Sequence, residues 1–238
     1  MTGESKVRIE KHITDIVLFD VIGYSKLSDE DQFRTIYRIN MKLQEYLRIL
    51  FGQSFVEVEE VILGFVPTGD GLYVILNHHV AGYGIFLAIS LRTILLKLRQ
   101  DTNSLFSGLR IAVHFGAVIP IKDLTGKTNF VGSGLNDCSR LVSVKKDIVS
   151  DQNFLEDENF IIVSSEALCY FKNRYQGPDI EKFLDVLQFK TGIEVSVTDK
   201  HGKIHKAHFI ESNRRVAVTP PKPLDLEKRL EKIREKHS

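Results

Sequence analysis

Cysteines, long apolar runs and an excess of charge of one sign are all scarce in this sequence. Its 238 residues hold only Cys138 and Cys169, which lack metal-ligand spacing, so neither a disulfide framework nor a zinc site is indicated. No run approaches the roughly 18 apolar residues of a membrane span, and the first residues lack the apolar core of a signal peptide. Because 32 basic side chains balance 31 acidic ones, no global field attracts nucleic acid or an anionic membrane. We expect a cytoplasmic protein that binds neither nucleic acid nor membrane.

The chain is long enough for one substantial hydrophobic core. Its composition is 43% hydrophobic, and 238 residues are too few for two ordinary domains and a linker. A polar leader covers residues 1–11, and a Pro-rich hinge with a charged amphipathic helix covers residues 213–238. We therefore predict a single catalytic-size domain over residues 12–212.

The first half of the sequence predicts alternating strands and helices. An apolar run over residues 12–19 ends at Asp20 and predicts a buried strand, and Ser28 then caps a helix that extends to about residue 50. Further expected elements are strands over residues 55–66 and 72–76, a helix over about 80–99 and a strand over 109–119. This βαββαβ order is the ferredoxin-like palm, an α+β fold in which helices cover one face of an antiparallel sheet.

The second half of the sequence predicts an α/β extension of this palm. Its expected elements are a loop over residues 120–129, a helix over 134–145, a strand over 160–163, a helix over 164–171, and strands over 183–190, 192–198 and 203–210. His201, His205 and His208 lie on or near the last of these strands. Because His205 and His208 point to opposite faces of a strand, exposed histidines are favoured over a metal cluster.

Three motifs carry the chemistry of this sequence. They are FDVIGYSKL at residues 19–27, TGDG at 68–71, and LRIAVHFG at 109–116 followed by VGSGLNDCSRL at 131–141. Together they resemble the class III nucleotidyl cyclases, the family of adenylate and guanylate cyclase catalytic domains. The resemblance covers residues 12–145, with weaker similarity to about residue 190. It implies the class III cyclase fold and the conversion of a nucleoside triphosphate to a cyclic nucleotide and pyrophosphate.

Asp20 and Asp70 are the candidate metal ligands. The end of the first strand and the tip of the adjacent hairpin lie side by side in a palm, so both carboxylates can reach one site. The resemblance implies that they hold two Mn²⁺ or Mg²⁺ ions together with the carbonyl of Val21. It also assigns phosphate binding to the turn of Gly23, Tyr24 and Ser25. Taken alone, either aspartate reads as an ordinary turn former, and only the combination of motifs favours a metal site.

Asn136 and Arg140 lie four residues apart on a predicted helix, so both point to one side of it. The resemblance implies that Asn136 orients the ribose and that Arg140 stabilises the charge that develops on phosphate. In the family these residues come from the partner chain of a head-to-tail homodimer, so two chains build two composite sites. The lysine that binds the triphosphate is assigned to Lys190, with Lys203 and Lys206 as alternatives.

The positions that read the base depart from the purine cyclases. Those enzymes carry Lys or Glu six residues before the second aspartate, where this chain has Gly64, and a second base-reading position falls on Asn129. A stand-alone domain without these side chains resembles the pyrimidine cyclases of bacterial antiphage Pycsar systems, which use CTP or UTP and signal to a separate effector. Two alternatives stay open: an adenylate or guanylate cyclase that reads the base otherwise, and an inactive cyclase-homology module that senses nucleotides. A diguanylate cyclase is disfavoured because residues 68–72 lack its Gly-Gly-Asp/Glu-Glu-Phe motif.

Overall fold

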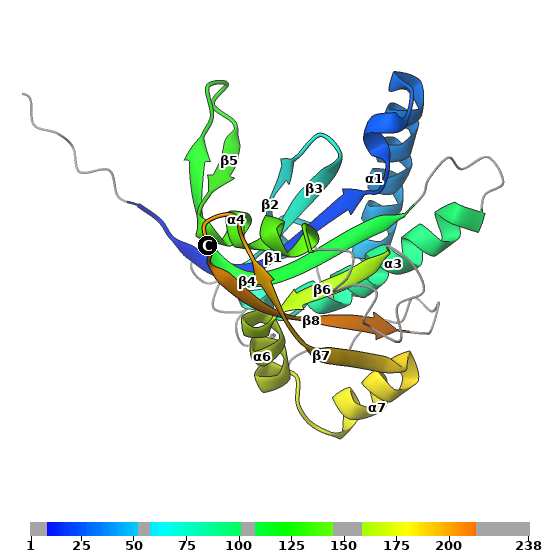
Figure 1. Ribbon diagram of the computed structural model, residues 1–238, viewed down its shortest axis with the longest axis vertical. Coiled ribbons are helices and arrows are strands. Elements are labelled where there is room, and N and C mark those ends of the chain that lie inside the picture. The colour runs from blue at the N-terminus through cyan, green and yellow to red at the C-terminus, as the bar shows by residue number, and fades with distance from the viewer. Residues whose placement is uncertain (1–8, 52–57, 101–107, 145–158, 213–238) are drawn as a thin grey trace, which may run out of the picture.

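One mixed β-sheet forms the centre of the computed structural model, which describes residues 9–51, 58–100, 108–144 and 159–212 (Figure 1). Its strands are β1 (His12–Val21), β2 (Ile62–Pro67), β3 (Gly71–Leu76), β4 (Leu109–Lys122), β5 (Thr128–Val131), β6 (Phe160–Ser164), β7 (Phe189–Thr198) and β8 (Ile204–Ser212). The order across the sheet is β2-β3-β1-β4-β6-β8-β7, and β5 pairs with β4 outside this path. Strands β4 and β6 pair in parallel, and the other pairs are antiparallel. The β2-β3-β1-β4 portion confirms the ferredoxin-like palm.

Helices lie on both faces of this sheet. They are α1 (Asp29–Phe51), α2 (Val58–Val61), α3 (Gly84–Gln100), α4 (Ser133–Val142), α6 (Ser165–Arg174) and α7 (Pro178–Leu187), with 3₁₀ turns η1 (Tyr24–Lys26) and η3 (His78–Val80). Residues of α1, α3, α6 and α7 share one hydrophobic core with the sheet, whereas α4 packs over a second core on the opposite face. Figure 1 shows α4 in front of the sheet. This helix therefore covers part of the face that a minimal palm leaves open.

Strand β1 is buried on both sides. Val17 and Phe19 point into the larger core, and Ile16 and Leu18 point toward α4. A central strand covered on both faces needs apolar side chains in succession, which explains the uninterrupted apolar run of this segment.

Helix α1 begins at the predicted N-cap. The backbone N–H of Asp31 donates to Ser28 Oγ at 3.3 Å, and the Ser28 hydroxyl donates to the Asp31 carboxylate at 2.6 Å. This reciprocal contact satisfies one of the backbone N–H groups that a helix start leaves without a partner. The prediction of a helix after Ser28 is confirmed.

The strand predicted over residues 183–190 is wrong, because most of this segment belongs to α7. Pro178 occupies the start of α7, and the helix buries Ile180, Phe183 and Leu187 along one side. These spacings are helical, and proline is favoured at a helix start. Strand β7 begins only at Phe189 and takes in the strand predicted over residues 192–198.

The loop predicted over residues 120–129 is shorter than expected, because only residues 123–127 form a turn. Strand β4 continues to Lys122 and turns back as β5, with Ile119 opposite Val131 and Lys122 opposite Thr128. Pro120 lies within β4 opposite Phe130, and proline is tolerated in a strand where no partner needs its missing N–H donor. The strand predicted over residues 55–66 is shorter than expected, because β2 begins at Ile62. Residues 52–57, like the leader before residue 9 and the hinge and helix from residue 213, lie outside the described residues.

A buried carboxylate fixes the start of α3 against β1. Asp15 accepts hydrogen bonds from the backbone N–H groups of Gly82 at 2.6 Å and Gly84 at 2.8 Å. Arg174 lies nearby and donates to the carbonyl oxygens of Ala81 and His79. Burial raises the pKa of Asp15 to about 6, and the two backbone hydrogen bonds and Arg174 oppose this rise. Asp15 therefore belongs to the scaffold.

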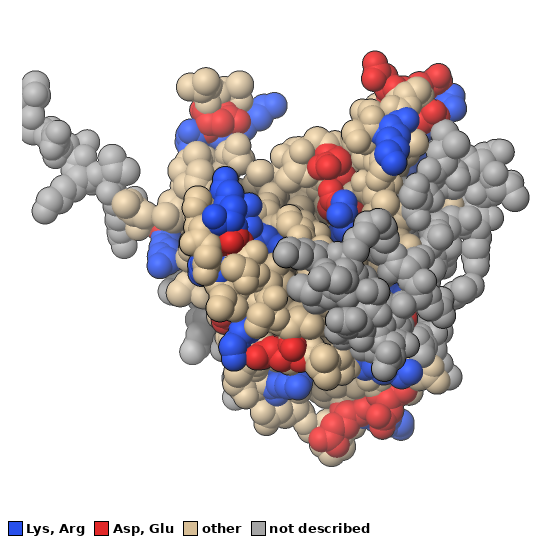
Figure 2. Space-filling view, in the orientation of Figure 1, with Lys and Arg blue, Asp and Glu red and all other residues tan. Residues whose placement is uncertain are grey.

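Charges of both signs are interspersed on the surface shown in Figure 2. This mixture agrees with a formal net charge of +1. Among the residues that the structure describes, no helix is long and apolar enough to cross a membrane.

Candidate active site

The end of β1 and the turn between β2 and β3 meet at one edge of the sheet. Asp20 lies opposite Gly71 of β3, and the Val21 N–H donates to the carbonyl oxygen of Asp70 at 2.9 Å. The turn is closed by the Thr68 N–H, which donates to the Gly71 carbonyl oxygen at 3.1 Å. The register of two neighbouring strands therefore places Asp20 and Asp70 side by side, although 50 positions separate them in the sequence.

Arg110 completes this group of charges. It lies opposite Asp20 in the pairing of β1 with β4, and its Nη2 is 2.6 Å from Asp20 Oδ2. Burial raises the pKa of Asp20, Arg110 opposes this rise, and the neighbouring Asp70 carboxyl adds to it. The sequence motifs contain Arg110 but give it no role. Only the strand register shows that it faces a candidate metal ligand.

The donor set of this edge fits a hard divalent cation. Asp20 and Asp70 offer carboxylate oxygens, and no third His, Cys, Asp or Glu joins them in a metal-binding group within the described ranges. Mg²⁺ typically takes one or two carboxylates and completes its octahedron with water and substrate phosphates. Two carboxylates and the Val21 carbonyl thus suit Mg²⁺ or Mn²⁺ bound together with a triphosphate.

The turn after β1 is held beside the same edge. Gly23 adopts φ +72°, and the Lys26 N–H donates to its carbonyl oxygen at 3.0 Å, which closes η1. The Ile22 N–H donates to the Gly108 carbonyl oxygen at 2.9 Å. Gly23, Tyr24 and Ser25 therefore follow Asp20 directly in a fixed turn.

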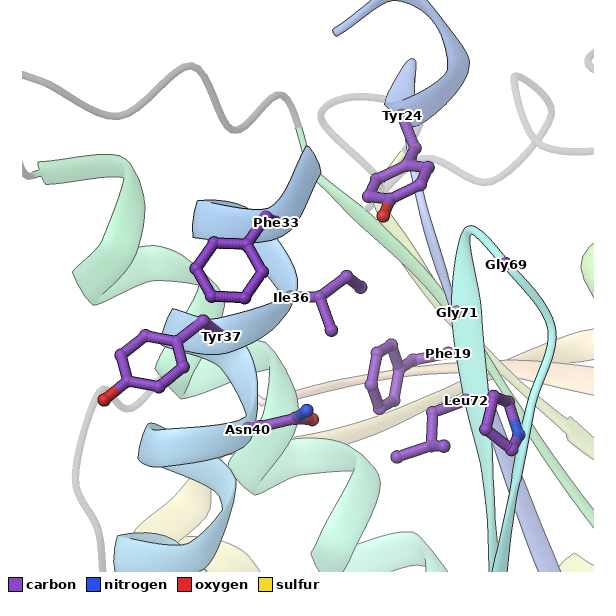
Figure 3. Close-up of a pocket in the computed structure, with 10 residues that line it drawn as sticks. Phe19, Tyr24, Phe33, Ile36, Tyr37, Asn40, Gly69, Gly71 and Leu72 are labelled. Carbon is purple, nitrogen blue, oxygen red and sulfur yellow. The ribbon is translucent and has the colours of Figure 1, made fainter. Parts of the chain in front are cut away.

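A cavity of about 370 Å³ opens next to this turn, between α1 and the β2–β3 hairpin. In Figure 3, Ile36 and Asn40 of α1 face Phe19 and Leu72 of the strands, and Tyr24 lies above them. The cavity lies on the face of the sheet that carries the larger core, and the β2–β3 hairpin, whose turn contains Asp70, forms one of its walls.

Helix α4 approaches the opposite face of the sheet very closely. A Cβ on Gly134 would lie 2.5 Å from Ile16 Cδ1 and 2.8 Å from the Ala117 carbonyl oxygen, so only glycine permits this approach. The Tyr73 hydroxyl donates to the Leu135 carbonyl oxygen at 3.3 Å and fixes the same turn of the helix.

The candidate residues of α4 lie on its outer side. Asn136 is exposed and Arg140 is half-buried, one helical turn apart. Within the described part of the chain, no hydrogen bond or ion pair joins Arg140 to Asp20 or Asp70. The structure therefore presents two separate groups: Asp20, Asp70 and Arg110 at the sheet edge, and Asn136 and Arg140 on α4.

The three candidate lysines lie in different places. Lys190 is near the start of β7, opposite Glu211, and Lys206 forms an ion pair with Glu194 at 3.0 Å. Lys203 contacts Asp137 of α4, with its Nζ 2.9 and 2.8 Å from the two carboxylate oxygens. Lys203 is thus the one of the three that lies against the helix carrying Asn136 and Arg140.

The expectation of exposed histidines is wrong for His205. His201 is exposed, but His205 is buried because its strand face packs with Ala207 and Phe209 under α4. His208 points to the other face, as the alternation of a strand requires.

A phenylalanine ring covers the position where purine cyclases carry a base-reading side chain. A Cβ on Gly64 would lie 2.7 Å from Phe130 Cζ, so the ring occupies the space of any side chain at this position. Phe130 is itself buried, with 5% of its surface exposed. The Asn129 amide oxygen accepts a hydrogen bond from the Phe130 N–H at 2.8 Å. Gly64 therefore has no room for a base-reading side chain, and the amide oxygen of Asn129 is engaged by the backbone.

Comparisons with known proteins identify the fold. No protein-family model matches the chain, and no curated protein matches it. The guanylate cyclase domain of RhGC from Catenaria anguillulae in complex with GTP is 14% identical, with a TM-score of 0.57 over 86% of this chain and 100% of that one. The catalytic core of a rhodopsin-guanylyl cyclase with converted specificity, in complex with ATPαS, is 15% identical, with a TM-score of 0.56 over 87% and 100%. The adenylyl cyclase CyaB from P. aeruginosa is 15% identical, with a TM-score of 0.50 over 87% and 98%. The chain has the fold of an adenylyl or guanylyl cyclase catalytic domain.

Proposed function

We propose that this protein is a nucleotidyl cyclase. In this reaction the ribose 3′-hydroxyl oxygen bonds to the α-phosphorus, loses its proton, and pyrophosphate leaves. The observation that carries the proposal is the pairing of Asp20 and Asp70 beside Arg110 at one sheet edge, because it supplies cation ligands and a fixed positive charge together.

Each residue of the sheet edge has a role in this reaction. Asp20, Asp70 and the Val21 carbonyl hold the divalent cations. When bound, two Mn²⁺ or Mg²⁺ ions activate the 3′-hydroxyl and neutralise the triphosphate. The backbone N–H groups of the turn from Gly23 to Ser25 bind phosphate, and the Arg110 guanidinium faces the same charge.

A second copy of the chain completes the site. Arg140 of one chain stabilises the charge on phosphate at the metal edge of the other, and Asn136 orients the ribose. A head-to-tail homodimer then holds two such composite sites. The position of Lys203 next to α4 supports it, rather than Lys190, as the lysine that binds the triphosphate.

The substrate that we propose is a pyrimidine nucleoside triphosphate, CTP or UTP. Phe130 over Gly64 supports this choice, because an apolar ring fills space that a purine-reading side chain would need. We further propose that the cyclic CMP or cyclic UMP is a signal in antiphage defence and activates a separate effector protein.

The test is product formation by the purified protein with each of the four ribonucleoside triphosphates and Mn²⁺ or Mg²⁺. Mass spectrometry of the products identifies the base, and the Asp70→Ala variant is the control. Cyclic CMP or cyclic UMP supports the proposal, and turnover of ATP or GTP alone contradicts the pyrimidine choice.

A purine cyclase is the second candidate, favoured by the GTP and ATPαS in the similar solved structures. The same assay separates the two substrates. Absence of metal-dependent turnover with all four triphosphates would instead favour an inactive cyclase-homology module that senses nucleotides.

A further inference from the structure

Helix α4 is joined to the β7–β8 hairpin by a bidentate ion pair. Lys203 Nζ lies 2.9 and 2.8 Å from Asp137 Oδ1 and Oδ2, across 66 positions of sequence. Asp137 directly follows Asn136 and lies one turn from Arg140. The ion pair therefore holds a lysine ammonium beside the two candidate catalytic residues of α4.

The backbone of Lys203 is fixed as well. The carboxylate of Asp199 accepts hydrogen bonds from the N–H groups of His201 at 2.8 Å and Lys203 at 3.0 Å. The Asp199 N–H donates to the Lys203 carbonyl oxygen at 2.9 Å, which closes the turn. Ordering a free lysine side chain costs conformational entropy. Here both ends of the side chain are restrained before any substrate binds.

A buried histidine lies between the two carboxylates. His205 has its Nε2 3.5 Å from Asp199 Oδ2 and its Nδ1 4.0 Å from Asp137 Oδ1, with 8% of its side chain exposed. Burial on this side leaves the Asp137 side chain only 21% exposed. Asp137 thus lies between His205 and Lys203.

The same hairpin carries an ion pair of a different kind. Lys206 and Glu194 lie 3.0 Å apart with side chains 63% and 41% exposed, and Glu194 accepts a hydrogen bond from Ser165 of α6. This pair faces away from α4. Exposed ion pairs contribute little to stability, so this pair serves as a matched control.

We propose that Asp137 is a positioning residue, which orients the Lys203 ammonium for the triphosphate bound at the partner chain's metal edge. This inference rests on the proposed function, because it needs a composite site. It gives a role to a residue to which the resemblance assigns none, and it makes the β7–β8 hairpin part of the same half-site as Asn136 and Arg140.

The first experiment compares the steady-state kinetics and melting temperatures of Asp137→Asn and Glu194→Gln. We expect Asp137→Asn to lower kcat about tenfold, because misplacing a charged group weakens transition-state stabilisation. Asp137→Glu, which keeps a carboxylate within reach of Lys203, should recover part of this loss, and Glu194→Gln should match the wild type. A lowered melting temperature with unchanged kcat for Asp137→Asn would mean a structural role only and would overturn the proposal.

The second experiment assigns Asp137 to a half-site. Mixed dimers are formed from Asp70→Ala chains with either Arg140→Ala or Asp137→Lys chains, and product formation is measured. Both mixtures should recover activity, because each mixed dimer has one site free of both substitutions. Recovery with Arg140→Ala but not with Asp137→Lys would overturn the positioning role and leave the cyclase proposal intact. Failure of the Arg140→Ala mixture would overturn the composite site, and the positioning role with it.

Discussion

The two aspartates of β1 form a natural comparison, because they are the same residue type on one strand. Asp15 is 1% exposed, points into the larger core and is satisfied by two backbone N–H groups at the start of α3. Asp20 lies on the opposite face at the strand end, where it contacts Arg110 and neighbours Asp70. Burial raises the pKa of both carboxyls.

The difference between them lies in their partners. The partners of Asp15 are backbone groups that leave it no free direction, so it stabilises the fold. The partners of Asp20 are charged side chains at a sheet edge, where the proposed function would place a cation and phosphate. A raised pKa therefore does not by itself mark a reacting group, whereas the nature of its partners does.

The largest effect is expected at the sheet edge. Asp20→Asn should lower product formation about a thousandfold, because it removes a charged ligand of the cations. The melting temperature should change little, since Asp20 is only partly buried. Activity within tenfold of the wild type would remove Asp20 from the metal site.

Asp15→Asn should act on stability and leave turnover unchanged. Because burial raises the folded-state pKa of Asp15 from 3.8 to about 6, the wild-type free energy of unfolding should fall as pH rises between these values. The full loss is about 3 kcal/mol. An asparagine oxygen can still accept both N–H groups, so the part of this slope that Asp15 contributes should vanish in the variant, whereas the part from Asp20 remains. Urea unfolding at pH 4, 5, 6 and 7 measures how the free energy of unfolding depends on pH, and Asp185→Asn, at an exposed position, is the control. Equal pH slopes in the wild type and both variants would contradict the raised pKa of Asp15.

Arg110→Gln tests whether the charge beside Asp20 is functional. We expect kcat/KM to fall about a hundredfold, because the guanidinium faces both Asp20 and the incoming phosphates. Arg110→Lys should recover only part of this loss, since an ammonium lacks the bidentate geometry. Unchanged kinetics in Arg110→Gln would give Arg110 the scaffold role that Asp15 has.

The smallest effect concerns shape rather than charge. Phe130→Leu shortens the side chain over Gly64, and we expect the purine-to-pyrimidine ratio of kcat/KM to rise about tenfold. A volume change of this size costs about 1–2 kcal/mol of stability, so thermal unfolding is the control. An unchanged ratio would show that Phe130 does not limit the size of the base.

The sequence predicted the fold best where local signals agreed with the tertiary structure. The apolar run of β1, the cap at Ser28 and the Gly-flanked Asp70 turn led to the correct palm. Prediction was weaker in the second half, where residues 183–190 were taken for a strand although Pro178 begins a helix there. A short apolar segment fits both the helical and the strand period, and packing against the sheet decides which of the two structures forms.

The sequence alone determined the motifs, the βαββαβ order of the palm, and the two aspartates to which the chemistry is assigned. Only the tertiary structure decided what faces them: Arg110 opposite Asp20, Phe130 over Gly64, and Lys203 on Asp137. Each of these contacts joins elements far apart in the sequence. Local patterns specify the period and the ends of a helix or strand. Strand register and helix docking instead arise when whole faces of the sheet and helices are buried together, so no short segment encodes them.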